Sequence, residues 1–150
     1  MKETDLAYMA GIVDGEGCIY GHLANRKQNV AGNIDIRVTI QAVSMAMILK
    51  AKAICEELGL TPSYAFNKIF KLSKRPAHRV DIMRKQDVQV FLQAVLPYLI
   101  VKRREAEMVL EWYENWGNDM RKGPRVLHLA QPHEDRLLFL EKLRAAKRVA

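Results

Sequence analysis

Several features that define common protein classes are missing from this chain of 150 residues. No apolar run approaches the about 18 residues that a membrane-spanning helix needs. The first five residues, Met-Lys-Glu-Thr-Asp, are too polar for a secretory signal. We therefore expect a soluble intracellular protein without a membrane partner. It would lie in the cytoplasm or nucleoid, or in an organelle matrix if an organelle encodes it.

Residues for metal or covalent chemistry are also sparse. Cys18 and Cys55 lie in apolar surroundings without the spacing of metal ligands, which predicts reduced core residues rather than a disulfide. No nucleophile elbow and no phosphate-cradling glycine loop is present. No paired zinc spacing connects the four histidines, which are His22, His78, His128 and His133.

Positive charge, in contrast, is abundant. The chain has 24 Lys and Arg against 17 Asp and Glu, for a formal net charge of +7. This balance favours a polyanionic partner, with nucleic acid first and an anionic membrane surface second. The 49% hydrophobic content and the length fit one domain over residues 1–150. Within it we place a core at about residues 4–117 and a C-terminal helical extension at about 118–150.

Residues 7–19 combine a helix with an abrupt stop. Apolar residues recur at helical spacing, and Thr4 and Asp5 offer an N-cap and first-turn acidic groups. Two glycines and two carboxylates follow in the run Asp-Gly-Glu-Gly. The helix should therefore end near Asp14 and release Glu16 into a turn before the next strand.

The same helix carries small residues at Ala7, Ala10, Gly11 and Gly15. Small side chains let another helix approach the backbone closely, at a cost in helix propensity. The alternative is that they pack under the chain's own sheet and that the glycine-rich run is an ordinary turn.

The rest of the chain repeats a strand–strand–helix plan twice. Alternating apolar residues predict strands, and apolar residues at helical spacing predict helices, with Ser44 as an N-cap and Gly59 as a stop. The predicted strands cover residues 18–23, 32–41, 64–72 and 78–83, and the predicted helices continue at residues 44–59, 86–96, 102–116 and 133–147. The order is αββαββα with extra C-terminal helices, an α+β fold with a four-stranded antiparallel sheet.

Residues 9–17, Met-Ala-Gly-Ile-Val-Asp-Gly-Glu-Gly, resemble the nine-residue motif that names the LAGLIDADG homing endonucleases, with Met9 in place of the usual Leu. The element order is similar to that family too. The resemblance implies the single-motif homodimeric type, whose curved sheet binds DNA. It also implies a magnesium-dependent endonuclease, with Mn²⁺ as a substitute. Such an enzyme would cut both strands of a long pseudo-palindromic site and leave 3′ overhangs, as an intron-encoded homing endonuclease does.

The resemblance also implies roles for the residues of the motif. Glu16 stands at the position of the family's metal-binding carboxylate, and the Gly15 carbonyl is a candidate second ligand. One carboxylate is a poor metal site, so the other half would come from a second chain. The implied dimer interface consists of Ala7, Ala10, Gly11, Asp14 and Gly15. Asp14 would bond across the helix pair; the alternative is a simple residue of the helix end.

Two further residues would organise water near the metal. Lys102 is our choice for the family's lysine, because residues 96–102 resemble the segment before that lysine. The alternative is that Lys102 belongs to a solvated basic run with Arg103 and Arg104. Gln41 is our choice for the polar residue, and Ser44 could fill that role instead.

Base reading would fall to the polar face of the sheet. The candidates on the first hairpin are His22, Arg26, Gln28, Asn33, Asp35, Arg37 and Thr39. The candidates on the second hairpin are Lys74, Arg75, Arg79 and Asp81, with Asn67, Lys68 and Lys71 dependent on the strand register. Phosphate contacts would suit Arg121, Lys122 and Arg125. Each of them is equally compatible with a solvated surface charge.

Two rival functions remain open from the sequence. A LAGLIDADG protein without cleavage could act as an intron-RNA maturase or as a DNA-binding regulator. A chain that keeps only the helix-pairing face would be a dimeric interaction module without a nucleic-acid role.

Overall fold

The computed structural model describes residues 1–24, 33–71, 74–116 and 133–149. The elements follow the predicted αββαββα order, and two further helices follow them at the C-terminal end. Their bounds are α1 Glu3–Glu16, β1 Gly17–Ala24, β2 Asn33–Ala42, α2 Met45–Glu57, β3 Ser63–Lys68, β4 Ala77–Ile82, α3 Lys85–Val95, the 3-10 turn η1 Leu96–Tyr98, α4 Arg103–Trp116 and α5 His133–Val149.

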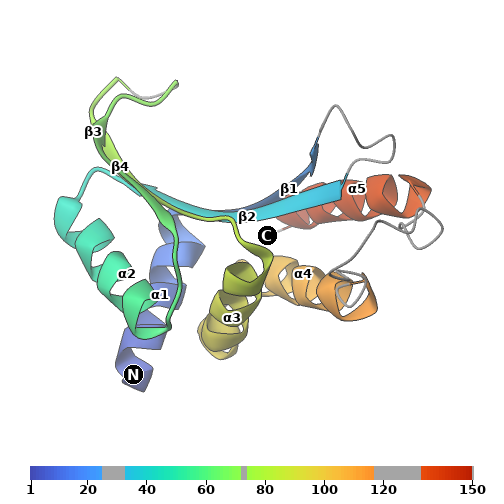
Figure 1. Ribbon diagram of the computed structural model, residues 1–150, viewed down its shortest axis with the longest axis horizontal. Coiled ribbons are helices and arrows are strands. Elements are labelled where there is room, and N and C mark those ends of the chain that lie inside the picture. The colour runs from blue at the N-terminus through green and yellow to red at the C-terminus, as the bar shows by residue number, and fades with distance from the viewer. Residues whose placement is uncertain (25–32, 72–73, 117–132, 150) are drawn as a thin grey trace, which may run out of the picture.

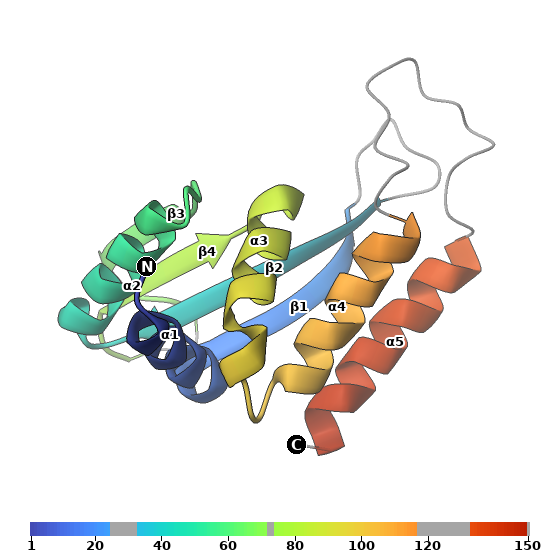
Figure 2. The ribbon, with the colours of Figure 1, turned by 90° about the horizontal axis from the view of Figure 1, so that it is seen from below.

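The four strands form one antiparallel sheet in the order β1-β2-β4-β3. Helices α1 to α4 lie on one side of this sheet, below it in Figure 1, and α5 lies at the right-hand end of β1 and β2. Figure 2 shows the helices from beneath. The sheet is curved, and no described helix covers its concave face (Figure 1). The predicted α+β class with a curved four-stranded antiparallel sheet is confirmed.

Strict alternation in β2 decides which face is covered. Ile36, Val38 and Ile40 are at most 3% exposed and pack toward the helices, as the sequence predicts. From the helical layer, α3 contributes an apolar stripe that is completely buried, namely Val88, Phe91, Leu92 and Val95. Burying each such side chain contributes about 1.5–3 kcal/mol to the stability of the fold. The contact between β2 and α3 therefore forms the centre of the core.

The motif helix α1 differs from its prediction at both ends. Lys2 is the N-cap residue and makes no side-chain cap bond, while Asp5 forms an ion pair of 2.6 Å with Lys50 on α2. At the other end the helix continues to Glu16 instead of ending near Asp14, and β1 begins at once. Gly17 permits this sharp junction, because a Cβ there would lie 2.7 Å from the Val13 carbonyl oxygen.

Strand β3 is shorter than the predicted strand over residues 64–72. Its pairing with β4 shifts register between Ala65 and Lys68, and Asn67 adopts a positive φ of 52°. The Asn67 amide donates to Nδ1 of the buried His78 instead of continuing a regular ladder. The mixed polarity of this segment reflects an irregular edge strand, which is why its faces could not be assigned.

The last helix, α5, packs against the edge strand β1. A Cβ at Gly21 would lie 2.9 Å from Leu140 Cδ2, so the glycine allows the helix to approach closely. Leu140 and Leu143 are buried, whereas Leu137 is 46% exposed. No helix in the described ranges combines the length and the apolar character that crossing a membrane requires.

Candidate functional site

Asp14, two residues before the end of α1, fixes the loop that precedes α4. Its Oδ2 accepts the Ile100 amide at 2.8 Å, and its Oδ1 accepts the Lys102 amide at 2.9 Å. The Asp14 carbonyl oxygen accepts the Lys102 ammonium at 2.6 Å. Asp14 is therefore a structural tie within its own chain. Its bonding across a helix pair stays a prediction.

Lys102 is set apart from the two arginines that follow it. Its side chain is half-buried and held against the end of α1, whereas Arg103 and Arg104 are exposed on α4. Arg103 reaches along its own helix and pairs with Glu107 at 3.0 Å. The geometry therefore favours an anchored lysine over a member of a solvated basic run.

Glu16 closes α1 and is exposed, and no described residue bonds to its carboxylate. Gly15 beside it is exposed as well. Among the described residues, no group of three or more His, Cys, Asp or Glu side chains could hold a metal. One exposed carboxylate at a helix end suits a hard divalent cation such as Mg²⁺, but it supplies only half of a ligand set.

A hollow of about 240 Å³ opens beside Lys102, and its lining is Cys18, Val101, Lys102, Glu105 and Lys147. Glu105 is 3% exposed. Burial raises the pKa of its carboxyl above the usual value, while Lys147 and Lys102 oppose that shift. Sequence reasoning missed Glu105 and Lys147. No local pattern marks them, because Glu105 on α4 and Lys147 on α5 come to lie beside the same hollow only through the packing of the two helices.

The two cysteines have different surroundings and are both free. Cys55 is buried as predicted, and burial raises the pKa of its thiol to about 12. Cys18 is exposed on the edge strand, where its Sγ lies 3.5 Å from Lys147 Nζ. The prediction of a core residue was wrong for Cys18, because its position in β1 places it on the helix-free face.

The small residues of α1 divide between two sides of the helix. Ala7, Gly11 and Gly15 are exposed, and a Cβ on either glycine would meet nothing within 4 Å. Ala10 has no exposed surface and packs into the chain's own core, so its assignment to a dimer interface was wrong. Ile100 is 85% exposed, and its amide is bonded to the same helix end.

Gln41 and Ser44, the two candidates for the polar position, have partners of their own. Gly17 pairs with Ile40, so Gln41 lies next to the point where α1 meets the sheet. Its Oε1 accepts two bonds from Arg79, at 2.8 and 3.2 Å. The Ser44 hydroxyl accepts the Met47 amide at 3.3 Å and caps α2, as predicted. Neither is placed by contact with Glu16.

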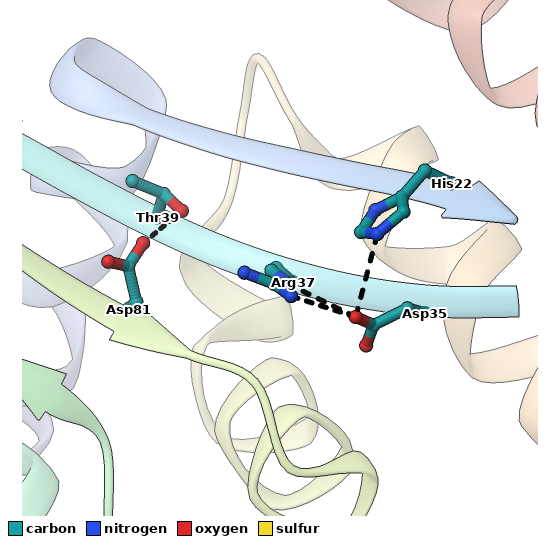
Figure 3. Close-up of polar contacts among 5 residues, drawn as sticks. All are labelled: His22, Asp35, Arg37, Thr39 and Asp81. Atoms are coloured by element: carbon teal, nitrogen blue, oxygen red, sulfur yellow. Dashed lines mark hydrogen bonds and ion pairs between the residues drawn. The ribbon is translucent and has the colours of Figure 1, made fainter. Parts of the chain in front are cut away.

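The concave face of the sheet carries a row of linked polar side chains (Figure 3). Asp35 accepts two bonds from Arg37 on the same strand, at 2.9 and 3.3 Å, and this pairing raises the pKa of the guanidinium. His22 on β1 lies 3.7 Å from the same carboxylate. Tyr20, which the sequence reasoning missed, stacks near His22 with ring centroids 6.4 Å apart.

The row continues across β4. Thr39 donates to Asp81 at 2.6 Å, as Figure 3 shows, and the Arg79 guanidinium lies 4.0 Å from the centre of the Phe70 ring. Lys68 at the end of β3 is exposed, as are Lys74 and Arg75 before β4. The structure therefore brings six of the predicted base-reading residues onto one helix-free surface, namely His22, Asp35, Arg37, Thr39, Arg79 and Asp81.

Some predicted contacts lie outside the described residues. The residues concerned are Arg26, Gln28, Arg121, Lys122 and Arg125, together with the side chain of Asn33. Their roles stay predictions.

The fold matches that of solved homing endonucleases. The homing endonuclease I-CvuI, in complex with its target in the presence of calcium, superposes with a TM-score of 0.62 and 19% identity over 94% of this chain and 95% of that one. The archaeal intron-encoded homing endonuclease I-Vdi141I, complexed with DNA, superposes with a TM-score of 0.61 and 16% identity over 97% of this chain and 99% of that one. The LAGLIDADG meganuclease I-AabMI, bound to uncleaved DNA, superposes with a TM-score of 0.63 and 16% identity over 97% of this chain and 45% of that one.

No protein-family model and no curated protein matches the sequence. At these identities the structural likeness establishes the LAGLIDADG homing endonuclease fold.

Proposed function

We propose that this protein is a site-specific DNA endonuclease that hydrolyses phosphodiester bonds as a homodimer with the help of a divalent metal. The observation that carries the proposal is the end of α1, where the exposed Glu16 lies at the junction with the sheet and Lys102 is bonded to Asp14, two residues before Glu16. The same helix end leads directly into the concave polar face. Chemistry and recognition would thus share one surface.

Glu16, with the Gly15 carbonyl, would hold Mg²⁺ or the substitute Mn²⁺. A bound divalent cation supplies charge neutralisation at the phosphate and lowers the pKa of a water molecule. Lys102 would contribute a fixed positive charge beside the phosphate, with Gln41 or Ser44 as the polar neighbour. The carboxylate of Asp14 is engaged with two amides and would keep the Lys102 loop in place.

A second copy of the chain would complete the site. Ala7, Gly11 and Gly15 form an exposed strip of small residues on which a symmetry-related α1 could pack closely. The exposed Ile100 side chain at the same helix end would add apolar surface to this contact. Pairing α1 with its copy brings two Glu16 carboxylates together, and the twofold symmetry explains a pseudo-palindromic target.

The concave face would enter the major groove of double-stranded DNA. Arg, Gln and Asp side chains at these positions offer the donors and acceptors that distinguish base pairs. Arg37 and Arg79 are already oriented by neighbours, and an oriented guanidinium loses less freedom on binding. Cleavage of both strands with 3′ overhangs is part of the proposal.

The test is a cleavage selection. A randomised duplex library is incubated with the protein and Mg²⁺, and the newly formed ends are sequenced. We expect ends clustered in one long pseudo-palindromic sequence, and no ends when a chelator replaces the metal. Specific binding without any metal-dependent nick would instead support the non-cutting DNA-binding or intron-RNA maturase alternative. Failure to bind any nucleic acid at low salt would support a dimeric interaction module.

A further inference from the structure

The hollow beside Lys102 brings together cationic groups from opposite parts of the fold. Lys102 reaches it from the start of α4, and Lys147 reaches it from the last turn of α5. Lys102 is bonded to the Asp14 carbonyl oxygen, whereas the contact of Lys147 is a thiol, Cys18 Sγ at 3.5 Å. An ammonium has three donors and a thiol is a weak acceptor, so Lys147 keeps most of its binding capacity.

The hollow is also lined by a buried carboxyl group, that of Glu105, which is 3% exposed. Burial raises the pKa of this carboxyl, and the ammonium groups of Lys147 and Lys102 oppose that shift. Both lysines are thus close enough to act on Glu105, and neither forms a close ion pair with it. The volume of about 240 Å³ far exceeds the roughly 30 Å³ share of one water molecule, so a larger group fits.

We propose that this hollow binds a phosphate of the DNA backbone and that Lys147 of α5 is its second cation beside Lys102. The inference rests on the proposed function, because it assigns the hollow to the same DNA partner. It gives α5 a role beyond packing. The contact of Leu140 with Gly21 brings α5 onto β1, and the last turn of the helix then delivers Lys147 to the edge of the polar face.

The test measures the salt dependence of binding to a random-sequence duplex, which requires neither the target nor cleavage. Each phosphate contact contributes a slope of about −0.9 to log Kobs against log salt. K147Q should reduce the slope by about 0.9 per protomer, and K147R should restore it. The matched control is K142Q, which removes the same charge from an exposed position on α5 outside the hollow. It should change the slope much less.

Thermal unfolding of each variant shows whether the fold is retained, and K147R, with its positive charge preserved, serves as a second check. A K147Q slope equal to that of wild type would overturn the inference and leave the endonuclease proposal intact. Equal losses in K147Q and K142Q would also overturn it, because they would indicate a diffuse charge effect. If the wild-type protein binds no duplex DNA at low salt, the proposed function itself fails.

Discussion

The end of α1 and the concave face of the sheet are both polar, but they are held in different ways. At the end of α1, Asp14 bonds to main-chain amides and Lys102 bonds to a main-chain carbonyl. On the concave face, Arg37, Asp35, Thr39 and Asp81 bond to one another through side chains alone. The functional side chains are therefore positioned by main-chain groups at the end of α1 and by other, exchangeable side chains on the concave face.

This difference matches two different demands. Catalytic groups need fixed geometry, and main-chain bonds fix it independently of the neighbouring side chains. A recognition surface must be able to change its target without loss of the fold, and pairs of half-buried side chains can be replaced together. Substitutions at the two regions should therefore have different consequences, and the following experiments measure them.

The largest effect should come from Glu16→Gln. The change keeps the size of the side chain and removes the charge that would hold the metal, a loss of several kcal/mol in transition-state stabilisation. Cleavage should fall by about 10³-fold or more while target binding persists, as a nicking assay and a gel-shift assay would measure. The matched control is Glu3→Gln at the exposed start of the same helix. Unchanged cleavage in E16Q would remove Glu16 from the site.

The next effect should come from Lys102→Gln, with Arg103→Gln as its neighbour control. Removing one fixed charge beside the phosphate should slow cleavage by about 10²-fold. Arg103 makes only an exposed pair with Glu107, so R103Q should leave the cleavage rate nearly unchanged. Single-turnover kinetics at saturating enzyme compares them. Equal rates for the two variants would mean that Lys102 is an ordinary member of a basic run.

A smaller effect, on stability, should follow from Asp14→Asn. The asparagine side chain lacks the negative charge. It also keeps only one of the two oxygen atoms that accept the main-chain amides of Ile100 and Lys102. We expect the free energy of unfolding to fall by about 1.5–3 kcal/mol, measured by urea denaturation. Asp35→Asn on the concave face is the comparison, and its effect should be smaller. A greater loss for D35N would reverse the distinction between the two regions.

The smallest effect should come from Arg37→Lys, which keeps the charge but loses the planar fork that grips Asp35. Because the charge is kept, target affinity should weaken by only about 1 kcal/mol, roughly 5-fold in Kd, with stability unchanged. Competition binding with target and random duplexes measures the ratio of the two affinities. Arg104→Lys on the exposed side of α4 is the control, and it should change neither target affinity nor stability. A uniform loss on both duplexes would indicate phosphate contact rather than base reading.

Periodicity predicted most of this fold because it reports burial directly. The alternation of β2 and the apolar stripe of α3 needed no tertiary information to be read correctly. Strand β3 failed because its register shift and the positive φ at Asn67 depend on pairing with β4. The end of α1 was misplaced by two residues because glycines favour a stop, whereas here Gly17 allows a direct helix-to-strand junction.

The candidate site was predicted in part for the same reason. The motif pointed to Glu16 and Asp14 because they lie within one short run of sequence. Glu105 and Lys147 join the site only through the packing of α4 and α5, which no local pattern contains. Ala10 was assigned to the wrong side of α1 because residue size does not tell which face of a helix is covered by its own sheet.

The pairing of two α1 helices is tested most directly by Gly11→Leu, measured by sedimentation and by cleavage of the selected target. A Cβ at Gly11 would meet nothing within 4 Å, so the monomer should keep its fold and gain up to about 1 kcal/mol in helix propensity. Gln93→Leu adds the same residue to an exposed position on α3 and is the control. We expect wild type and Q93L to be dimers that cleave, and G11L to be a folded monomer that does not. A G11L dimer, or a monomeric wild type that cuts both strands, would contradict a site shared between two copies.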